Sequence, residues 1–180
     1  MKKQVSIIAM LLCVAMVAVA GCKKAPVSSN NMPNTTTEQK KEKALAPDFS
    51  LTDIEGKTFT LSSLRGKIVV IDFWGSWCGW CIKGMPEMKK YYEKYKGKLE
   101  IVGVDCGDTD AKWKAAVKEL ELPWTHVYNP KSMGDITAMY GIQGFPTKFI
   151  VGKDGELLKT IIGEDPEFYT ALDEIMKGEK

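Results

Sequence analysis

Hydrophobic residues in this chain fall into short runs and helical spacings that alternate from about residue 45 onward. The run at 68–74 is apolar except for Asp72, as is typical of a strand buried on both faces. After residues 75–81, hydrophobic residues recur at a helical period, at Met85, Met88, Tyr92 and Tyr95. The pattern therefore predicts a buried central strand that leads directly into a helix.

The remaining elements follow the same alternation. They are a hairpin of 49–51 and 58–60, a helical turn at 61–64, a strand at 100–105, a helix capped by Asp110 that buries Trp113, Ala116, Val117 and Leu120, a strand at 124–128, a brief helix at 136–140, a hairpin of 147–151 and 157–162, and a closing helix at 166–176. This order predicts an α/β fold with a mixed central sheet flanked by helices, extended at its N-terminus by a β-hairpin.

The chain begins with the features of a bacterial secretory signal. Lys2 and Lys3 precede an almost purely apolar stretch at 5–20, which is shorter than the roughly 20 residues that a permanent membrane helix needs. The stretch ends in Val19-Ala20-Gly21-Cys22, which resembles a bacterial lipobox and implies cleavage before Cys22 and a lipid on that cysteine. We therefore predict a lipoprotein signal peptide at 1–22, and an ordinary signal peptide with an incidental cysteine is the alternative.

Two further regions follow the signal. Residues 23–44 are mostly Ser, Asn, Thr, Pro and Lys, and with so little to bury they are expected to form a flexible polar tether. Residues 45–180 are long enough for one domain with a single core. The whole chain carries a net charge of +2, but lysines of the leader and tether account for it and leave residues 45–180 at −3. Nothing in that balance favours a nucleic-acid partner.

Cys78 and Cys81 stand where the buried strand ends and the helix begins. Residues three apart on a first helical turn have Cβ atoms about 5–6 Å apart, which is close to disulfide geometry. The positive end of the helix favours a thiolate, so Cys78 is the predicted nucleophile and Cys81 the resolving thiol. Asp72 should be desolvated below this turn, with a raised pKa, and could exchange a proton with Cys81. A structural aspartate satisfied by backbone or water is the alternative.

Several of these segments resemble the thioredoxin superfamily. Residues 72–81, Asp-Phe-Trp-Gly-Ser-Trp-Cys-Gly-Trp-Cys, are similar to its active-site stretch, and Pro86 matches the proline that kinks its active-site helix. Residues 46–67 resemble the beginning of the ResA/TlpA-like branch, and the segment containing Phe145-Pro146 is similar to the loop that carries a cis-proline opposite the cysteines. The resemblance covers the chain from about residue 46 to its end and implies a thioredoxin-like fold.

The resemblance also implies a function. It implies a protein-disulfide oxidoreductase that is lipid-anchored in the cell envelope and faces the periplasm, acting as a reductant in cytochrome c maturation or envelope thiol maintenance. Its implied partners are disulfide-containing envelope proteins and an upstream thiol carrier that donates electrons; no cofactor or metal is expected. Trp80 replaces the family's usual proline, which leaves the redox direction open. Gly84 stands where ResA-type members often carry glutamate, which leaves Asp72 as the expected assisting carboxylate.

The residues around Cys78 offer a surface for partners. Trp77 and Trp80 flank the cysteine and are expected to form an apolar platform. Phe145 and Pro146 are expected to pair with an incoming peptide as a short added strand. A non-enzymatic binding module that docks partners on the two tryptophans is the competing class, and Trp77 could also simply pack under the start of the helix.

Other cysteine chemistry has weaker support. Cys106 is either a third thiol of the redox cycle or, as is more common, a small buried hydrophobic residue. His126, the only histidine, could complete a zinc site with the three thiols, but such sites usually pair their ligands closely on both sides. Haem attachment through CxxCH is excluded by Ile82, and a thiol peroxidase would want Thr or Ser in place of Gly75.

Overall fold

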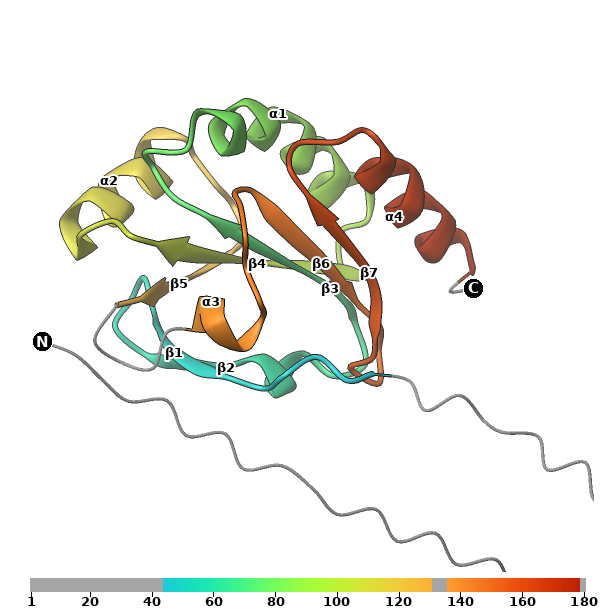
Figure 1. The fold of residues 1–180 in the computed structure, drawn as a ribbon. Coiled ribbons are helices and arrows are strands. Elements are labelled where there is room, and N and C mark those ends of the chain that lie inside the picture. Colours follow the sequence, from blue (N-terminus) through green and yellow to red (C-terminus); the bar gives the residue numbers. More distant parts are fainter. Residues whose placement is uncertain (1–43, 131–135, 179–180) are drawn as a thin grey trace, which may run out of the picture. The chain divides into compact units, whose positions relative to one another are not determined.

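The central element of the molecule is β3, Ile68–Trp74, which is buried along its whole length. The computed structural model describes residues 44–130 and 136–178, and in this part of the chain the strands form one seven-stranded sheet in the order β2-β1-β5-β4-β3-β6-β7 (Figure 1). The other strands are β1 Ser50–Asp53, β2 Thr58–Thr60, β4 Leu99–Cys106, β5 Thr125–Asn129, β6 Thr147–Val151 and β7 Leu157–Ile162. β3, β4 and β5 are parallel and the remaining pairs are antiparallel, so the sheet is mixed.

Helices cover both faces of this sheet (Figure 1). One face carries α1 Gly79–Lys94, α2 Asp110–Glu119 and α4 Glu167–Gly178, and the other carries α3 Ile136–Met139 and the 3-10 turn η1 Leu61–Leu64. Because successive side chains of a strand point to opposite faces, β3 serves two cores. Ile68, Val70 and Trp74 pack under α1, whereas Val69, Ile71 and Phe73 pack toward α3.

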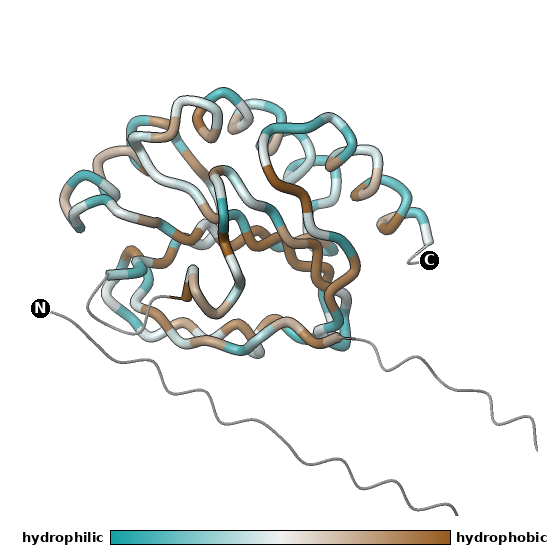
Figure 2. The backbone as a smooth tube through the Cα atoms, in the orientation of Figure 1, coloured by the Kyte–Doolittle hydropathy of each residue, from teal (hydrophilic) through white to brown (hydrophobic). Residues whose placement is uncertain are grey.

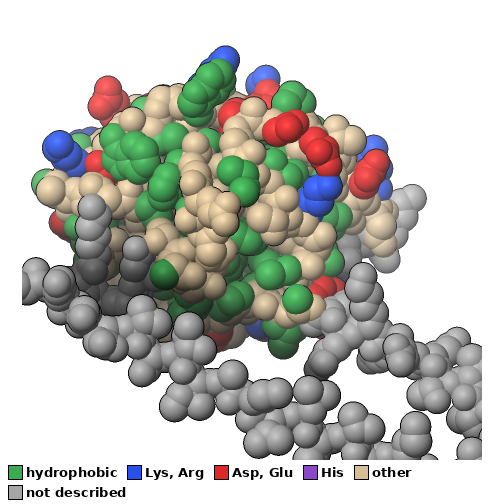
Figure 3. Space-filling model, viewed as in Figure 1, with side chains coloured by type: hydrophobic (Ala, Val, Ile, Leu, Met, Phe, Trp, Pro, Cys, Tyr) green, Lys and Arg blue, Asp and Glu red, His purple; other side chains and the backbone are tan. Residues whose placement is uncertain are grey.

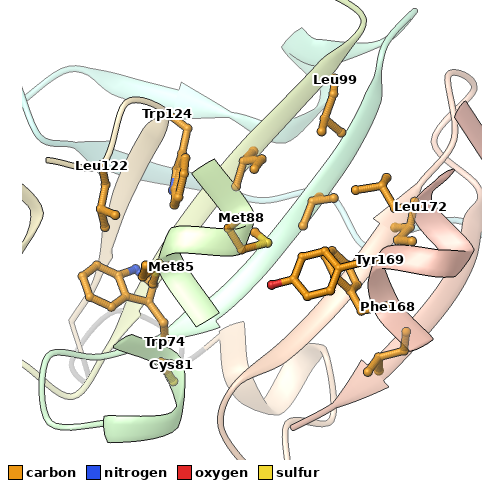
Figure 4. Close-up of a cluster of buried hydrophobic side chains, with 14 of the residues drawn as sticks. Trp74, Cys81, Met85, Met88, Leu99, Leu122, Trp124, Phe168, Tyr169 and Leu172 are labelled. Atoms are coloured by element: carbon orange, nitrogen blue, oxygen red, sulfur yellow. The ribbon is translucent and has the colours of Figure 1, made fainter. Parts of the chain in front are cut away.

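The larger core lies between the sheet and α1, α2 and α4. Trp74, Trp113, Phe168 and Leu172 are fully buried there, and Figure 4 shows Trp74 beside Met85, with Cys81 at one end of the cluster. The tube in Figure 2 is brownest along the strands and mostly teal or white on the outer turns of the helices. Burying each large apolar side chain contributes about 1.5–3 kcal/mol, so this layer holds α1 firmly against the sheet.

The structure confirms the predicted α/β fold, its mixed sheet and the N-terminal hairpin. One local prediction was wrong, because the N-cap of α2 is Thr109 and not Asp110. The Thr109 hydroxyl accepts a hydrogen bond from the Lys112 N–H at 3.4 Å, which leaves Asp110 in the first turn. In the first turn, the Asp110 carboxylate interacts favourably with the positive end of the helix dipole.

Some sequence predictions fall outside the described residues. The signal peptide, the lipidation site Cys22 and nearly all of the tether lie within residues 1–43 and stay predictions. In residues 44–130 and 136–178, no helix combines the length and the apolar character that crossing a membrane requires.

Candidate active site

A disulfide between Cys78 and Cys81 stands at the start of α1, with an S–S distance of 2.06 Å and a Cα–Cα distance of 5.3 Å. Cys78 is the N-cap of the helix, and its Sγ accepts a hydrogen bond from the Cys81 N–H at 3.1 Å. Cys78 is 6% exposed and Cys81 2%. A sulfur at this position faces the unpaired N–H groups and the positive end of the helix, which stabilise a thiolate once the disulfide is reduced.

The loop before Cys78 is tied to the end of β4. Asp108 accepts hydrogen bonds from the Ser76 N–H at 2.6 Å and from its hydroxyl at 2.7 Å, and the Trp77 indole N–H donates to the Cys106 carbonyl at 2.8 Å. The Cys78 N–H donates to the Gly75 carbonyl at 3.0 Å. These bonds hold the turn that presents the first sulfur.

Asp105 and Asp108 form a pair of acids beside this loop. Burial, and then the neighbouring Asp108 carboxylate, raise the pKa of Asp105 to about 8. Burial alone would raise the pKa of Asp108, but the two hydrogen bonds from Ser76, and then the proximity of Asp105, bring it below its usual value. Near neutral pH, Asp105 therefore stays protonated while Asp108 is ionised.

Asp72 lies on β3, on the sheet face that α1 covers. Burial raises its pKa to about 6, while the charge of Lys148 opposes that rise and the charge of Glu164 adds to it. Lys148 stands directly opposite Asp72 in the antiparallel β3–β6 ladder, with its Nζ 4.0 Å from the Asp72 Oδ1. A buried acid whose pKa approaches neutrality is a candidate for proton transfer.

Aromatic side chains surround the disulfide at the surface. Trp77 is 55% exposed and Trp80 62%, and the Trp77 ring meets the edge of Phe145 with centroids 5.1 Å apart. The Phe145–Pro146 peptide bond is cis. Figure 3 shows hydrophobic side chains exposed over α1 at the top of the view. The structure therefore brings Trp77 and Phe145 together, while Trp80 stands apart under the Lys83 ammonium, 4.6 Å from its ring centroid.

Two grooves border the site. The first, of about 830 Å³, runs between the Trp77 loop and α2 and is lined by residues including Trp77, Ile82, Asp108 and Leu120. The second, of about 540 Å³, runs between α1 and α4 and is lined by residues including Trp80, Tyr91, Glu164 and Tyr169. Either groove offers room for an extended segment of another protein close to the disulfide.

Comparison with known proteins adds a family to this geometry. Residues 43–160 match the sequence model of the AhpC/TSA family. The thiol-disulfide oxidoreductase ResA of Bacillus thuringiensis subsp. konkukian (strain 97-27) is 39% identical over 133 residues, which are 73% of this chain and 75% of that protein. The chain belongs to the ResA family of thiol-disulfide oxidoreductases. The predicted ResA/TlpA-like branch and protein-disulfide oxidoreductase activity are thereby confirmed.

Solved structures agree with the assignment to the ResA family. A structure assigned to the thiol:disulfide interchange protein DsbE of Chlorobium tepidum superposes with a TM-score of 0.69 at 30% identity, over 76% of this chain and 95% of that one. The exposed lipoprotein thioredoxin Etrx1 of Streptococcus pneumoniae strain TIGR4 superposes with a TM-score of 0.62 at 26% identity, over 73% and 99%. The thioredoxin-like fold is therefore shared over the whole described domain.

The Cys106 side chain of this ResA-family chain lies on the other face of the sheet from the disulfide, and the His126 ring packs against tryptophans. Cys106 is buried in the core that α3 covers, on the sheet face opposite the disulfide, with its Sγ 3.5 Å from the Val104 carbonyl. His126 is stacked on Trp124, and burial lowers its pKa to about 3. Within residues 44–130 and 136–178, no cluster of three or more His, Cys, Asp or Glu side chains could hold a metal ion.

Four charged residues near the site had no part in the sequence prediction: Lys148, Glu164, Asp105 and Asp108. Two of them left a signal, because Lys148 and Asp105 are charged residues inside strands that are mostly apolar. Glu164 and Asp108 lie in loops, where charged residues are common, and nothing in their spacing points to the cysteines.

Proposed function

We propose that this ResA-family oxidoreductase works as an extracytoplasmic reductant of protein disulfides. The observation that carries the proposal is the position of Cys78, whose sulfur caps α1 and accepts the Cys81 N–H. A helix N-terminus lowers the pKa of such a thiol, and the thiolate is the attacking species in disulfide exchange. The reduced protein would then hold a ready nucleophile near neutral pH.

The proposed reaction runs through a mixed disulfide. The Cys78 thiolate attacks one sulfur of a partner's disulfide, so that a Cys78–partner bond forms and the other partner sulfur leaves as a thiolate. Cys81 then loses its proton and attacks the Cys78 sulfur, which releases the second partner sulfur as a thiolate. The partner disulfide has then gained two electrons, and the Cys78–Cys81 dithiol has lost two electrons and become a disulfide. An upstream thiol carrier must reduce it again.

Asp72 is proposed to accept the proton that Cys81 loses in the second step. The resolving thiol must lose a proton before it attacks, and a carboxylate whose pKa lies near 6 can accept that proton without a large energetic mismatch. Asp72 and Cys81 both belong to the layer between the sheet and α1. The alternative is a purely structural aspartate, but its Oδ1 accepts no hydrogen bond from any residue that the structure describes.

Partner segments are proposed to dock on Trp77, Trp80, Phe145 and Pro146. The two tryptophans expose large apolar surface next to the disulfide, and the contact between Trp77 and Phe145 joins the helix start to the loop before β6. A short extended segment could pair with the backbone of this loop while its side chains lie on the aromatic rings. Exposed aromatic surface of this kind is typical of interaction sites.

A membrane anchor would place this activity in the envelope. The sequence at 1–22 has the pattern of a lipoprotein signal, so that Cys22 would carry lipid and residues 23–44 would tether the domain on the periplasmic side. One structural neighbour is itself an exposed lipoprotein thioredoxin. Disulfide-containing envelope proteins, including those that mature cytochrome c, are the proposed substrates, and no nucleic-acid partner, cofactor or metal is proposed.

Insulin reduction by the full chain in detergent tests the proposal. Wild type should reduce insulin with dithiothreitol as donor, Cys78→Ser should abolish turnover, and the matched control Cys106→Ser should retain it because Cys106 lies on the other sheet face. A wild-type chain without turnover would support a binding module instead, and turnover of hydroperoxides without insulin reduction a thiol peroxidase. Titration in glutathione buffers then gives the direction: a potential near roughly −270 mV supports a reductant, and one near roughly −120 mV an oxidant.

A further inference from the structure

A buried lysine faces Asp72 under the active-site helix. Lys148 is only 2% exposed, and a buried ammonium is costly unless anions accompany it. Its Nζ lies 4.0 Å from the Asp72 Oδ1, which is too far for a hydrogen bond, and this oxygen accepts none from the described residues. Lys148 therefore acts on Asp72 through its charge, across the β3–β6 ladder.

The hydrogen-bonded partner of Lys148 is Glu164, from the loop after β7. The Glu164 Oε2 lies 2.7 Å from the Lys148 Nζ, and its Oε1 accepts the Tyr169 hydroxyl at 2.8 Å. The ammonium also lies over the Phe168 ring, 5.6 Å from its centroid. Glu164 therefore holds Lys148 in place while adding a second negative charge near Asp72.

Gly84 makes room for this carboxylate. A Cβ on residue 84 would overlap the carboxyl carbon and both oxygens of Glu164, with the farther oxygen at 2.7 Å. Glu164 therefore lies against the backbone of α1 one turn after Cys81, in space that any side chain at position 84 would fill. Gly84, Glu164 and Lys148 form a matched set: the helix lacks a side chain where the loop supplies a carboxylate.

We propose that Lys148 and Glu164 are positioning residues for the redox reaction, a charge pair that sets whether Asp72 is ionised when Cys81 must lose its proton. This inference rests on the proposed function, in which Asp72 exchanges a proton with Cys81. The two members act in opposite directions: the ammonium favours ionised Asp72, and the carboxylate favours protonated Asp72. Removing one or the other should therefore move the titration of Asp72 in opposite directions.

Other groups near Asp72 are neutral over the working range. The His126 ring occupies the space beside Gly103 of β4, where a side chain is missing. Its imidazole is neutral above about pH 3. Tyr169 of α4 is buried, and burial together with the Glu164 carboxylate raises the pKa of its hydroxyl. Asp105, one strand away, keeps its proton to about pH 8. The charge pair is thus what distinguishes the surroundings of Asp72 near pH 6.

The test is a carboxyl ¹³C NMR titration of the full chain in detergent, with labelled aspartate and Asp72 assigned by Asp72→Asn. In the oxidised protein, Lys148→Met should raise the Asp72 midpoint by about 1–2 pH units, a 10–100-fold change in proton affinity, and Glu164→Gln should lower it by about 0.5–1 unit. Lys159→Met and Glu167→Gln, which break an exposed ion pair between β7 and α4, are matched controls and should leave the midpoint unchanged.

A charge swap keeps the test decisive if Lys148→Met does not fold. Glu164→Gly alone should lower the midpoint as Glu164→Gln does. Adding Gly84→Glu should return the midpoint to within about 0.3 unit of wild type, because the new side chain starts where the old carboxylate ended and can reach Lys148. A double variant that stays at the shifted value, or single variants that move the midpoint the same way or not at all, would overturn the inference.

Turnover provides the second readout. The acid limb of the pH profile for insulin reduction should move with the NMR midpoint in each variant, whereas a merely structural pair would lower the rate without moving the limb. A wild-type chain that fails to reduce insulin overturns the proposed function, and with it the redox role of the pair. Unmoved NMR midpoints in an insulin-reducing enzyme overturn this inference alone.

Discussion

Replacing Asp105 with asparagine should make the stability of this protein less dependent on pH. In the folded protein Asp105 is fully buried and keeps its proton to about pH 8, whereas in the unfolded chain an aspartate releases it near about pH 4. Between these values the folded state binds more protons, so the free energy of unfolding falls as the pH rises. The stabilising contribution is fully present below about pH 4 and lost by about pH 8.

The size of the effect follows from the pKa difference. Each pH unit between the two pKa values removes about 1.4 kcal/mol of unfolding free energy, so raising the pH from about 5 to about 8 removes up to about 4 kcal/mol through this one group. Asparagine has nearly the same shape, and it carries no charge at any pH in this range. The variant should therefore stay within about 1 kcal/mol of wild type near pH 5 and gain about 2–4 kcal/mol on it near pH 9.

Guanidinium unfolding of both oxidised proteins at about pH 5 and about pH 9, followed by tryptophan fluorescence, gives the required comparison. Other groups titrate in both proteins and cancel in the difference. Asp154→Asn, in the exposed turn between β6 and β7, is the matched control and should change neither value by more than about 0.5 kcal/mol. A difference between wild type and Asp105→Asn that is the same at both pH values would refute the reasoning.

Further substitutions test the packing and the docking surface. Gly103→Ala should cost about 1–3 kcal/mol in denaturant unfolding, because its Cβ would lie 2.6 Å from the His126 Nδ1, whereas Gly79→Ala, whose Cβ meets nothing within 4 Å, should cost less than about 1 kcal/mol. Leu172→Ala, in the fully buried core under α4, should cost about 2–5 kcal/mol in the same assay, and a cost below about 1 kcal/mol would contradict the packing. Trp80→Ala should raise KM for insulin about 5- to 30-fold with a smaller change in kcat; an unchanged KM would remove Trp80 from the docking surface.

The fold could be predicted because its hydrophobic pattern is local and unambiguous. The run at 68–74 is too apolar for a surface strand and too short for a buried helix, and the helical spacing after it begins at once. The N-cap of α2 could not be chosen in the same way. Thr109 and Asp110 are adjacent and both suit the position, and only the backbone of the preceding residues decides which of them begins the helix.

The site residues also differ in whether the sequence could predict them. The cysteine pair lies within one helical turn, so its geometry follows from spacing alone, and Asp72 stood out as an acid in an apolar strand. Glu164 is 80 residues from Gly84 in sequence, and its proximity to α1 depends on how β7 leads into α4. No spacing rule connects such positions. The clearest sign of their contact is the glycine at position 84, and the sequence alone does not explain why a glycine is needed there.

The two acids with raised pKa values share one face of the sheet. In the parallel β3–β4 ladder Asp72 is level with Gly103 and Trp74 with Asp105, so both carboxyls point toward the layer under α1. Burial raises both pKa values, but Asp72 faces a lysine and Asp105 a carboxylate, and their values separate to about 6 and about 8. Near neutral pH, Asp72 is therefore ionised beside Lys148 while Asp105 stays protonated.

This separation matters for the sulfur at the end of the helix. A helix N-terminus offers an anion only about half a positive charge, and unpaired carboxylates on the same sheet face would cancel that attraction. The structure avoids this by pairing the charge of Asp72 with an ammonium and by keeping Asp105 protonated near neutral pH. In the proposed reaction, the ionisation of the Cys78 thiol therefore depends on the protonation of Asp72 and Asp105, as well as on the helix that Cys78 caps.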